Sequence, residues 1–540
     1  MRIKQLSIII FTAVSGFFQA QERPKLVVGI IVDQMRMEYL NRFRPYFVKD
    51  GFNRFLNEGF VYANMHFNYV PTYTAPGHAS VYTGSTPSRH GIIGNEWYRR
   101  AEGKEVYCVG DDSVQPLGNP EKDKEGMMSP RNLLATTVTD ELRLSTNFRG
   151  KVFGVSMKDR GAILPAGHFA NRAYWISNNL NFISSTFYGD DFPKWVVDFN
   201  QSKKYQKYIN KGWNLLRDKS VYKESLSDDN PYESQMFATK EHPVFPYNIK
   251  TEVEKTGLKA LKSTPFCNDL IIEFTEELIS REKLGTDDDT DFLAVSFSSP
   301  DYISHAMGPR SIEVQDTYLR LDETLAGFFK YLDSKVGKGN YLVFLTADHS
   351  GSENAKFLED RGYQVSSVDY KETKKQLKDF SVKTFGKDYI LDYNNQEVYL
   401  DLDALKTDGK NRQEIIAIFC DFIETFPSIE RTYTQNEILN ASPTDEYGSM
   451  IFRGYDKKQS GEIYIMMKPA FMEYQTTGAT HGTNYAYDTH VPGLFYGWKI
   501  PRGTSKEKVF ITEIAPTVAQ KINITLPNAT YGEVLKEVVD

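Results

Sequence analysis

Near-continuous runs of apolar and β-branched residues recur along the chain, and each run ends in polar or charged residues. The clearest runs cover residues 25–32, 151–157, 291–297 and 341–346. Such runs are typical of parallel strands that are buried on both faces of a sheet. The pattern therefore predicts a mostly parallel sheet whose carboxyl edge carries polar side chains.

Segments with helical spacing of apolar residues separate these strands. In residues 312–332, apolar side chains from Val314 onward recur at intervals of three and four, which predicts a helix. A later strand at 491–497 precedes a helix expected near Pro516. Alternating strands and helices predict an α/β fold with helices on both faces of the sheet. Ligands of open α/β sheets bind at the carboxyl ends of the strands, so candidate chemistry is sought there.

Two stretches interrupt this alternation. Residues about 180–285 are rich in Asn, Lys, Tyr and Asp with weak periodicity, so we expect loops and short helices inserted between core strands. Residues about 355–455 contain a strand-like QEVYLDL and a helix-like RQEIIAIFCDFIE, which indicates a small α/β cap. We expect one catalytic domain over residues 21–540 that carries these two insertions.

The first twenty residues differ from the rest. Arg2 and Lys4 precede an apolar stretch at 6–18, and Ala20 offers a small residue for cleavage. This pattern predicts a secretory signal peptide cleaved near Ala20, and hence a periplasmic or secreted protein. The alternatives are a buried N-terminal strand or a membrane anchor, but about thirteen apolar residues are too few to span a bilayer comfortably.

Composition and charge exclude several classes of protein. The 540 residues are 40% hydrophobic and 25% charged, as in soluble globular proteins. The formal charge of −7 becomes −9 once Arg2 and Lys4 are removed, which argues against a nucleic-acid-binding surface. The three cysteines are far apart in the sequence and show neither metal-type spacing nor a disulfide framework. We expect a monomer without nucleic-acid or membrane partners.

Three aspartates and three histidines follow predicted strand ends or lie in Gly- and Thr-rich loops. They are Asp33, Asp301, His305, Asp348, His349 and His481. Asp301 and His305 stand four residues apart, so a helix would bring both side chains to one point. Two sites with three protein ligands each would suit catalytic zinc. Singly, each Asp has an ordinary explanation as a helix cap or turn residue and each His as a hydrogen-bonded side chain.

The segment VPTYTAPGHASVYTGSTP, residues 70–87, contains a candidate nucleophile. If a helix begins near Pro76, Thr74 lies just ahead of it, where free N–H groups and the helix dipole favour an anion. The alternative is that Thr74 is simply the N-cap. A general base supplies about 10²–10⁴-fold, whereas hydrolysis of phosphate monoesters needs accelerations up to ~10²¹. A pair of metal ions about 4 Å apart would fit that demand better.

Ordered motifs spread over residues 25–500 resemble the alkaline phosphatase superfamily. They are IIVDQM, PTYTAPGHAS, STPSRHGIIGNEWY, PDYISHAMGP, TADHSG and THGTNYAYDTHVP. The threonine in the second motif is similar to that of the phosphate-irrepressible, broad-specificity alkaline phosphatases of flavobacteria. The resemblance implies a di-zinc hydrolase of small phosphate monoesters that acts through a phosphothreonine intermediate.

The resemblance also implies a role for each candidate residue. The implied ligands are, for the first zinc, Asp301, His305 and His481 and, for the second, Asp33, Asp348, His349 and the oxygen of Thr74. Thr74 would attack phosphorus to form the phosphothreonine intermediate, and water bound at the first zinc would then hydrolyse this intermediate. His490 is not assigned as a ligand.

Three further residues are implied to contact the phosphoryl group. Asn95 of GIIGNEWY matches an asparagine that binds a phosphoryl oxygen, and SMKDRGAILPAG supplies Lys158 and Arg160, which match a Lys-x-Arg pair. A dianionic monoester has more charge to neutralise than a diester, and Arg can meet it with two hydrogen bonds. Without the resemblance, basic residues after a strand would be read as solvated surface.

Other functions remain open from the sequence. A nucleotide pyrophosphatase/phosphodiesterase of the same superfamily would share the ligands and nucleophile but is expected to lack the Lys158 and Arg160 pair. A sulfatase is less favoured, because Thr74 cannot become formylglycine and His78 stands where arginine is needed. A noncatalytic metal-binding secreted protein is the alternative of a different class.

Overall fold

The computed structural model describes residues 22–118, 124–365, 367–473 and 477–539. The predicted signal peptide at 1–20 lies outside these residues. Within the described part of the chain, no helix combines the length and the apolar character needed to cross a membrane.

Buried apolar runs form the centre of a large sheet. Every residue of β1 (Leu26–Val32), β9 (Asp291–Phe297) and β10 (Tyr341–Thr346) is buried. β1 lies between β9 and β10 and is parallel to both. β6 (Val152–Ser156) continues the sheet beside β9, and β7 (Arg172–Ile176) follows it, again in parallel. The carboxyl ends of these strands therefore meet at one edge.

Antiparallel strands flank this parallel centre. β17 (His490–Gly497) runs antiparallel to β10 and to β2 (Phe60–His66), and β8 (Phe182–Ser185) runs antiparallel to β7. Within the described residues this large sheet has eleven strands, and three short ones complete it: β5 (Pro116–Leu117), β18 (Gly503–Ser505) and β19 (Val509–Phe510). The predicted α/β fold with a mostly parallel sheet is confirmed.

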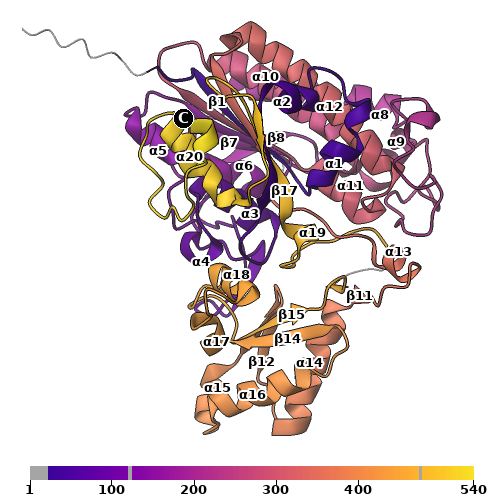
Figure 1. The fold of residues 1–540 in the computed structure, drawn as a ribbon, viewed down its shortest axis with the longest axis vertical. Coiled ribbons are helices and arrows are strands. Elements are labelled where there is room, and N and C mark those ends of the chain that lie inside the picture. The colour runs from indigo at the N-terminus through magenta and orange to yellow at the C-terminus, as the bar shows by residue number, and fades with distance from the viewer. Residues whose placement is uncertain (1–21, 119–123, 366, 474–476, 540) are drawn as a thin grey trace, which may run out of the picture.

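Helices cover both faces of the sheet (Figure 1). One layer contains α3 (Thr74–Thr83), α5 (Val138–Ser145), α6 (Asp159–Ala166) and α20 (Ile514–Lys521). The other contains α10 (Phe266–Glu282), α11 (Ser299–Met307) and α12 (Ile312–Leu332). Shorter helices are α1 (Met37–Arg42), α2 (Phe52–Glu58), α4 (Pro87–His90), α13 (Ala355–Glu359), α19 (Ala486–Thr489) and α21 (Lys536–Val539). The sequence predicts α12 with these bounds.

The helix that carries Thr74 begins earlier than its sequence indicates. α3 starts at Thr74 itself, and Tyr73 is the N-cap residue, without a side-chain capping bond. The helix does open near Pro76, but Thr74 is its first residue, so the expectations that Thr74 lies ahead of the helix or is its N-cap are wrong. Pro76 fits inside the first turn, because backbone N–H groups there have no partner within the helix.

A second sheet forms a separate small unit, which we call the cap (residues 370–467). Its antiparallel strands are β12 (Ile390–Asn394), β13 (Glu397–Leu400), β15 (Ile463–Met467) and β14 (Ile429–Thr434). Its helices are α14 (Tyr370–Phe385), α15 (Leu402–Thr407), α16 (Arg412–Ile423), α17 (Gln435–Leu439) and α18 (Glu446–Gly454). The cap has its own hydrophobic core around Leu377 and Phe419, and Figure 1 shows it below the main sheet.

The cap contacts the segment that leads into α3. Met450 accepts a hydrogen bond from the backbone of Val70, and Arg453 donates to the carbonyl of Asn68. These hydrogen bonds from the cap therefore help to fix the backbone of the segment that leads to Thr74.

The stretch at 180–285 holds more regular structure than its weak periodicity predicts. It contains β8, α7 (Lys194–Gln201), α8 (Gln206–Lys211), α9 (Ile249–Thr256) and the 17-residue α10. α10 packs against α12. That this stretch and the cap are insertions into the core stays a prediction.

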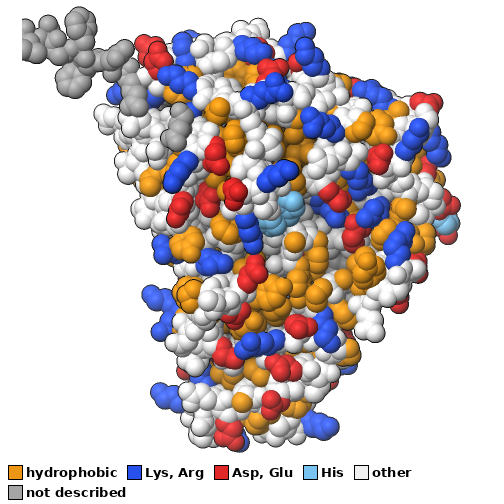
Figure 2. Space-filling view, in the orientation of Figure 1, with side chains coloured by type: hydrophobic (Ala, Val, Ile, Leu, Met, Phe, Trp, Pro, Cys, Tyr) orange, Lys and Arg blue, Asp and Glu red, His pale blue; other side chains and the backbone are white. Residues whose placement is uncertain are grey.

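On the face drawn in Figure 2, basic and acidic side chains are interspersed rather than segregated.

Candidate active site

One cluster of site residues gathers around the Nε2 atom of His349. Asp33 ends the run of β1, His349 follows β10, and Thr74 opens α3. His349 Nε2 lies 3.4 Å from Asp33 Oδ1, 3.5 Å from Thr74 Oγ1 and 3.6 Å from Asp348 Oδ2. These are the four residues that the resemblance assigns to one zinc. The structure brings them together from three separate elements.

A second cluster lies beside the first. Asp301 and His305 project from successive turns of α11, and His481 comes from the loop before α19. Asp301 Oδ1 lies 3.1 Å from His305 Nε2 and 3.9 Å from His481 Nε2. One ligand atom from each of these residues lies within 4.8 Å of the other two, so all three can contact one ion.

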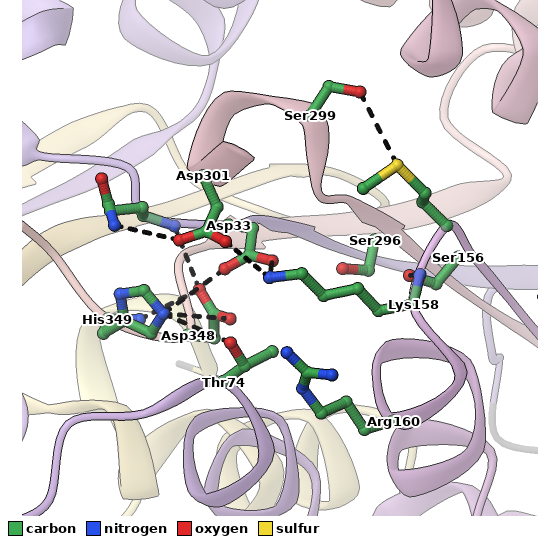
Figure 3. A network of polar contacts seen from close by, with 12 residues as sticks. Asp33, Thr74, Ser156, Lys158, Arg160, Ser296, Ser299, Asp301, Asp348 and His349 are labelled. Atoms are coloured by element: carbon green, nitrogen blue, oxygen red, sulfur yellow. Dashed lines mark hydrogen bonds and ion pairs between the residues drawn. The ribbon is translucent and has the colours of Figure 1, made fainter. Parts of the chain in front are cut away.

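The two clusters adjoin closely, and Figure 3 shows Asp301 of the second cluster beside Asp33, Asp348 and His349 of the first. The rings of His349 and His481 stack with centroids 3.5 Å apart. Lys158 reaches between the clusters, with its Nζ 2.6 Å from Asp33 Oδ2 and 2.7 Å from Asp301 Oδ2. The sequence predicted Lys158 only as a phosphate contact. Its ion pairs with both carboxylates are a finding of the structure.

The histidine tautomers suit metal binding. In His305, His349 and His481, Nδ1 lies 2.7 or 2.8 Å from a backbone carbonyl oxygen. A carbonyl can only accept, so each Nδ1 carries the proton and each Nε2 turns its lone pair toward the cluster. Metal-binding histidines are commonly oriented by this kind of bond.

The carboxylates are buried and crowded. Burial and the nearby charge of Asp33 raise the pKa of Asp348 well above its usual value. Burial and Asp301 oppose ionisation of Asp33, but Lys158 and His349 outweigh them and lower its pKa. Asp33 Oδ1 and Asp348 Oδ2 make no hydrogen bond within the described residues. Buried carboxylates need paired positive charge, and this set of N and O donors fits zinc.

Gln34 ties the two clusters together, and the sequence analysis missed it. Its backbone N–H donates to Asp348 Oδ1 at 3.2 Å, and its Nε2 donates to Asp301 Oδ1 at 2.9 Å. Gln34 has φ of +59°, a conformation uncommon for a residue other than glycine. Its place directly after Asp33 is the only sequence signal, and nothing in the local pattern indicates the unusual backbone.

The predicted phosphate contacts line one cavity with Thr74. The cavity has a volume of about 1350 Å³, and Asn95, Lys158 and Arg160 are among its lining residues. Asn95 Oδ1 accepts from the backbone N–H of Ala75 at 2.9 Å, which leaves the amide N–H groups available to a ligand oxygen. Figure 3 shows the Arg160 side chain extending toward Thr74.

The far wall of this cavity comes from the cap. Tyr370, Lys374, Asn394 and Asn395 line it. Asn394 Nδ2 also donates to Glu105 Oε1 of the main body at 2.6 Å. The sequence analysis expected the cap to shape access but named none of these residues, because their approach depends on tertiary packing.

Two other histidines are not among the assigned ligands, and one of them, His78, lies against the first cluster with its Nδ1 3.4 Å from Asp348 Oδ2. His490 stacks on His66 with ring centroids 4.7 Å apart, and its Nε2 lies 2.9 Å from a backbone carbonyl oxygen. His78 is fully buried in α3, with Nε2 2.9 Å from Ser296 Oγ. Burial lowers the pKa of His78 to about 4, so this ring is neutral, and its Nδ1 lies 2.9 Å from the carbonyl oxygen of Thr74.

Gly77 sets the distance between α3 and the residues after β10. A Cβ at Gly77 would lie 2.0 Å from the carbonyl oxygen of Asp348. We expect Gly77→Ala to push Thr74 away from His349, to destabilise the fold by about 1–3 kcal/mol and to lower turnover. Urea unfolding together with initial rates would test this.

Gly327→Ala is the matched control. Gly327 also lies in a helix, α12, and a Cβ there would meet nothing within 4 Å. Alanine is about 0.5–1 kcal/mol better than glycine inside a helix, so this variant should be at least as stable as the parent. Equal behaviour of the two variants would show that the contact at Gly77 does not matter.

Comparison with known proteins places this arrangement in a family. Residues 27–484 match the family model described as type I phosphodiesterase / nucleotide pyrophosphatase. The chain belongs to this family, within the alkaline phosphatase superfamily.

Two curated relatives match almost the whole chain. Alkaline phosphatase PafA of Elizabethkingia meningoseptica is 42% identical, with 97% of each chain covered. A protein of Myroides odoratus named calcium-transporting ATPase is 40% identical, with 98% of this chain and 99% of that protein covered. The crystal structure of wild-type PafA superposes with a TM-score of 0.93 at 42% identity, covering 96% of this chain and 100% of that one.

Proposed function

We propose that this protein is an alkaline phosphatase that hydrolyses small phosphate monoesters with two zinc ions and Thr74 as nucleophile. The convergence of Thr74, Asp33 and Asp348 on His349 Nε2 within 3.6 Å is the observation that carries the proposal. The adjoining cluster of Asp301, His305 and His481 supports a second ion. The similarity to alkaline phosphatase PafA over nearly the whole chain supports the substrate class.

Thr74 performs the displacement in two steps. When bound, the two zinc ions would supply positive charge beside the attacking and leaving oxygens at phosphorus. In the first step, Thr74 Oγ1 loses its proton to water and bonds to phosphorus, while the bond from phosphorus to the leaving oxygen breaks and that oxygen takes up a proton from water. In the second step, water attacks the phosphothreonine, which releases inorganic phosphate and restores the threonine hydroxyl.

Asn95, Lys158 and Arg160 bind the nonbridging phosphoryl oxygens. Lys158 has three N–H donors and gives two to Asp33 and Asp301, so one remains for the substrate. The Asn95 amide is oriented by its bond to the Ala75 N–H. Arg160 presents a planar set of donors that fits a phosphoryl group. Together these donors favour a dianionic monoester over a monoanionic diester.

The experiment that tests this function compares p-nitrophenyl phosphate with its bis-ester in the wild type and in Lys158→Ala/Arg160→Ala. Each charge-assisted hydrogen bond contributes about 1.5–3 kcal/mol. We therefore expect kcat/KM for the monoester to fall by about 10²–10⁴-fold. The diester rate should fall much less, because one fewer oxygen charge needs compensation.

Arg149→Ala/Lys151→Ala is the matched control. Arg149 and Lys151 are also two residues apart, but they lie just before β6, whereas Lys158 and Arg160 follow it. Their partners are Asp289 and the Glu282 carbonyl, away from the cavity. This variant should retain wild-type rates with both esters. A wild-type preference for the diester would instead assign the phosphodiesterase activity named in the family description.

The cellular setting is part of the proposal. Arg2, Lys4 and the apolar stretch at 6–18 support export and cleavage near Ala20. We propose a periplasmic or secreted enzyme. The monomeric state expected from the sequence stays a prediction.

A further inference from the structure

A hairpin on the main body links Asn95 to Arg160, two of the predicted phosphate contacts. Its strands, β3 (Glu96–Arg99) and β4 (Lys104–Tyr107), are antiparallel, and Glu96 pairs with Tyr107. The Cys108 N–H donates to the Asn95 carbonyl at 2.9 Å. Asn95 and Tyr107 therefore occupy the open end of the hairpin, where its two strands enter and leave the cavity wall.

The hydroxyl of Tyr107 joins a closed network with α6. It donates to Asp159 Oδ1 at 2.5 Å and accepts from Arg160 Nη1 at 3.0 Å. Asp159 Oδ1 also accepts from the backbone N–H of Arg160 at 2.6 Å. Burial and Asp159 together raise the pKa of Tyr107 well above its usual value, although Arg160 opposes them. The hydroxyl therefore remains protonated and fills both roles.

Within the described residues, the bond to Tyr107 is the only side-chain hydrogen bond of Arg160. Its Nε is buried and makes no hydrogen bond there. An arginine side chain has several rotatable bonds, and ordering them costs conformational entropy. A partner that fixes the guanidinium before the substrate arrives removes that cost from the reaction. Tyr107 is placed to do this.

We propose that Tyr107, backed by Asp159, is a positioning residue that holds Arg160 in the orientation needed for the transferred phosphoryl group. The hairpin thereby aligns Asn95 and Arg160 as one rigid unit. This inference rests on the proposed function, because it needs Arg160 to contact the substrate. Tyr107 itself acts through Arg160 and is assigned no contact with the reacting atoms.

The test is a double-mutant cycle with Tyr107→Phe and Arg160→Ala, with kcat/KM measured for p-nitrophenyl phosphate and its bis-ester. Tyr107→Phe keeps the ring and removes the hydroxyl, and we expect about a tenfold loss with the monoester. The diester rate should stay within about twofold. In the Arg160→Ala background, the tyrosine change should have no further effect, because its target is gone.

Binding of tungstate, an oxyanion that does not react, provides a second readout. Its affinity should weaken in Tyr107→Phe as monoester turnover does. Asp159→Asn retains an acceptor oxygen and should lie closer to wild type than Asp159→Ala. Tyr363→Phe is the control: Tyr363 is 61% exposed and is not among the residues that line the cavity. Thermal unfolding of each variant separates loss of fold from loss of positioning.

The possible results distinguish the inference from the function beneath it. Wild-type rates in Tyr107→Phe, combined with a large monoester loss in Arg160→Ala, would overturn the positioning role and leave the proposed function intact. Additive losses in the double variant would also overturn it. Unchanged monoester turnover in Arg160→Ala would remove Arg160 from the proposed phosphate site and the role of Tyr107 with it.

Discussion

Thr74→Ala is expected to lower monoester turnover by at least about 10³-fold, because it removes the only protein atom proposed to bond covalently to phosphorus. The loss should appear in kcat/KM for p-nitrophenyl phosphate at enzyme concentrations corrected for folded protein. Acid-quenched wild type should carry one phosphoryl group on the peptide that contains Thr74, detected by mass spectrometry. The alanine variant should carry none.

Thr83→Ala is the matched control for this change. Thr83 closes the same helix, α3, and its hydroxyl bonds the carbonyl of Ala79 at 2.8 Å. Its removal should cost about 1 kcal/mol of stability and leave the rate within about twofold. Thr74→Ser, which keeps a hydroxyl, should retain phosphorylation. Undiminished turnover in Thr74→Ala would exclude Thr74 as the nucleophile.

Removal of bound metal is expected to abolish turnover and to lower thermal stability. Asp33, Asp301 and Asp348 are buried beside one another, and a cation that binds only the folded state would stabilise it. Purified enzyme should hold about two zinc ions per chain, measured by plasma mass spectrometry. Dialysis against a chelator should remove activity, and added zinc should restore it.

His481→Ala extends this test to one cluster. It removes one of three ligands, so zinc content should fall toward one ion per chain and turnover by at least about 10²-fold. His490→Ala, which alters a histidine outside both clusters, should keep both ions and wild-type rates. Less than one zinc per chain without any turnover would favour the noncatalytic alternative. Full turnover after exhaustive chelation would remove metal from the mechanism.

The sequence predicted the elements whose environment is uniform along their length. β9, β10 and α12 have the predicted bounds, because burial on every side produces continuous apolar runs or strict helical spacing. Metal-ligand types at strand ends could also be recognised, since parallel strands deliver their carboxyl ends to one edge.

Features that depend on distant contacts could not be predicted in this way. The start of α3 at Thr74 and the positive φ of Gln34 are set by tertiary neighbours rather than by local preference. The bond between Tyr107 and Arg160 joins residues 53 positions apart. Neither residue type nor spacing indicates such a pairing, so the residues that position the phosphate contacts could be identified only from the structure.

The walls of the cavity come from two structural units, the main body and the cap. Its catalytic floor belongs to the main sheet, and the residues opposite, including Lys374 and Asn394, belong to the cap with its separate hydrophobic core. Substitutions in that opposite wall therefore change side chains that face the cavity without replacing any of the candidate metal ligands below. The part of the chain that would meet the leaving group is thus built separately from the part that would hold the metal ions, so each can be altered by substitution on its own.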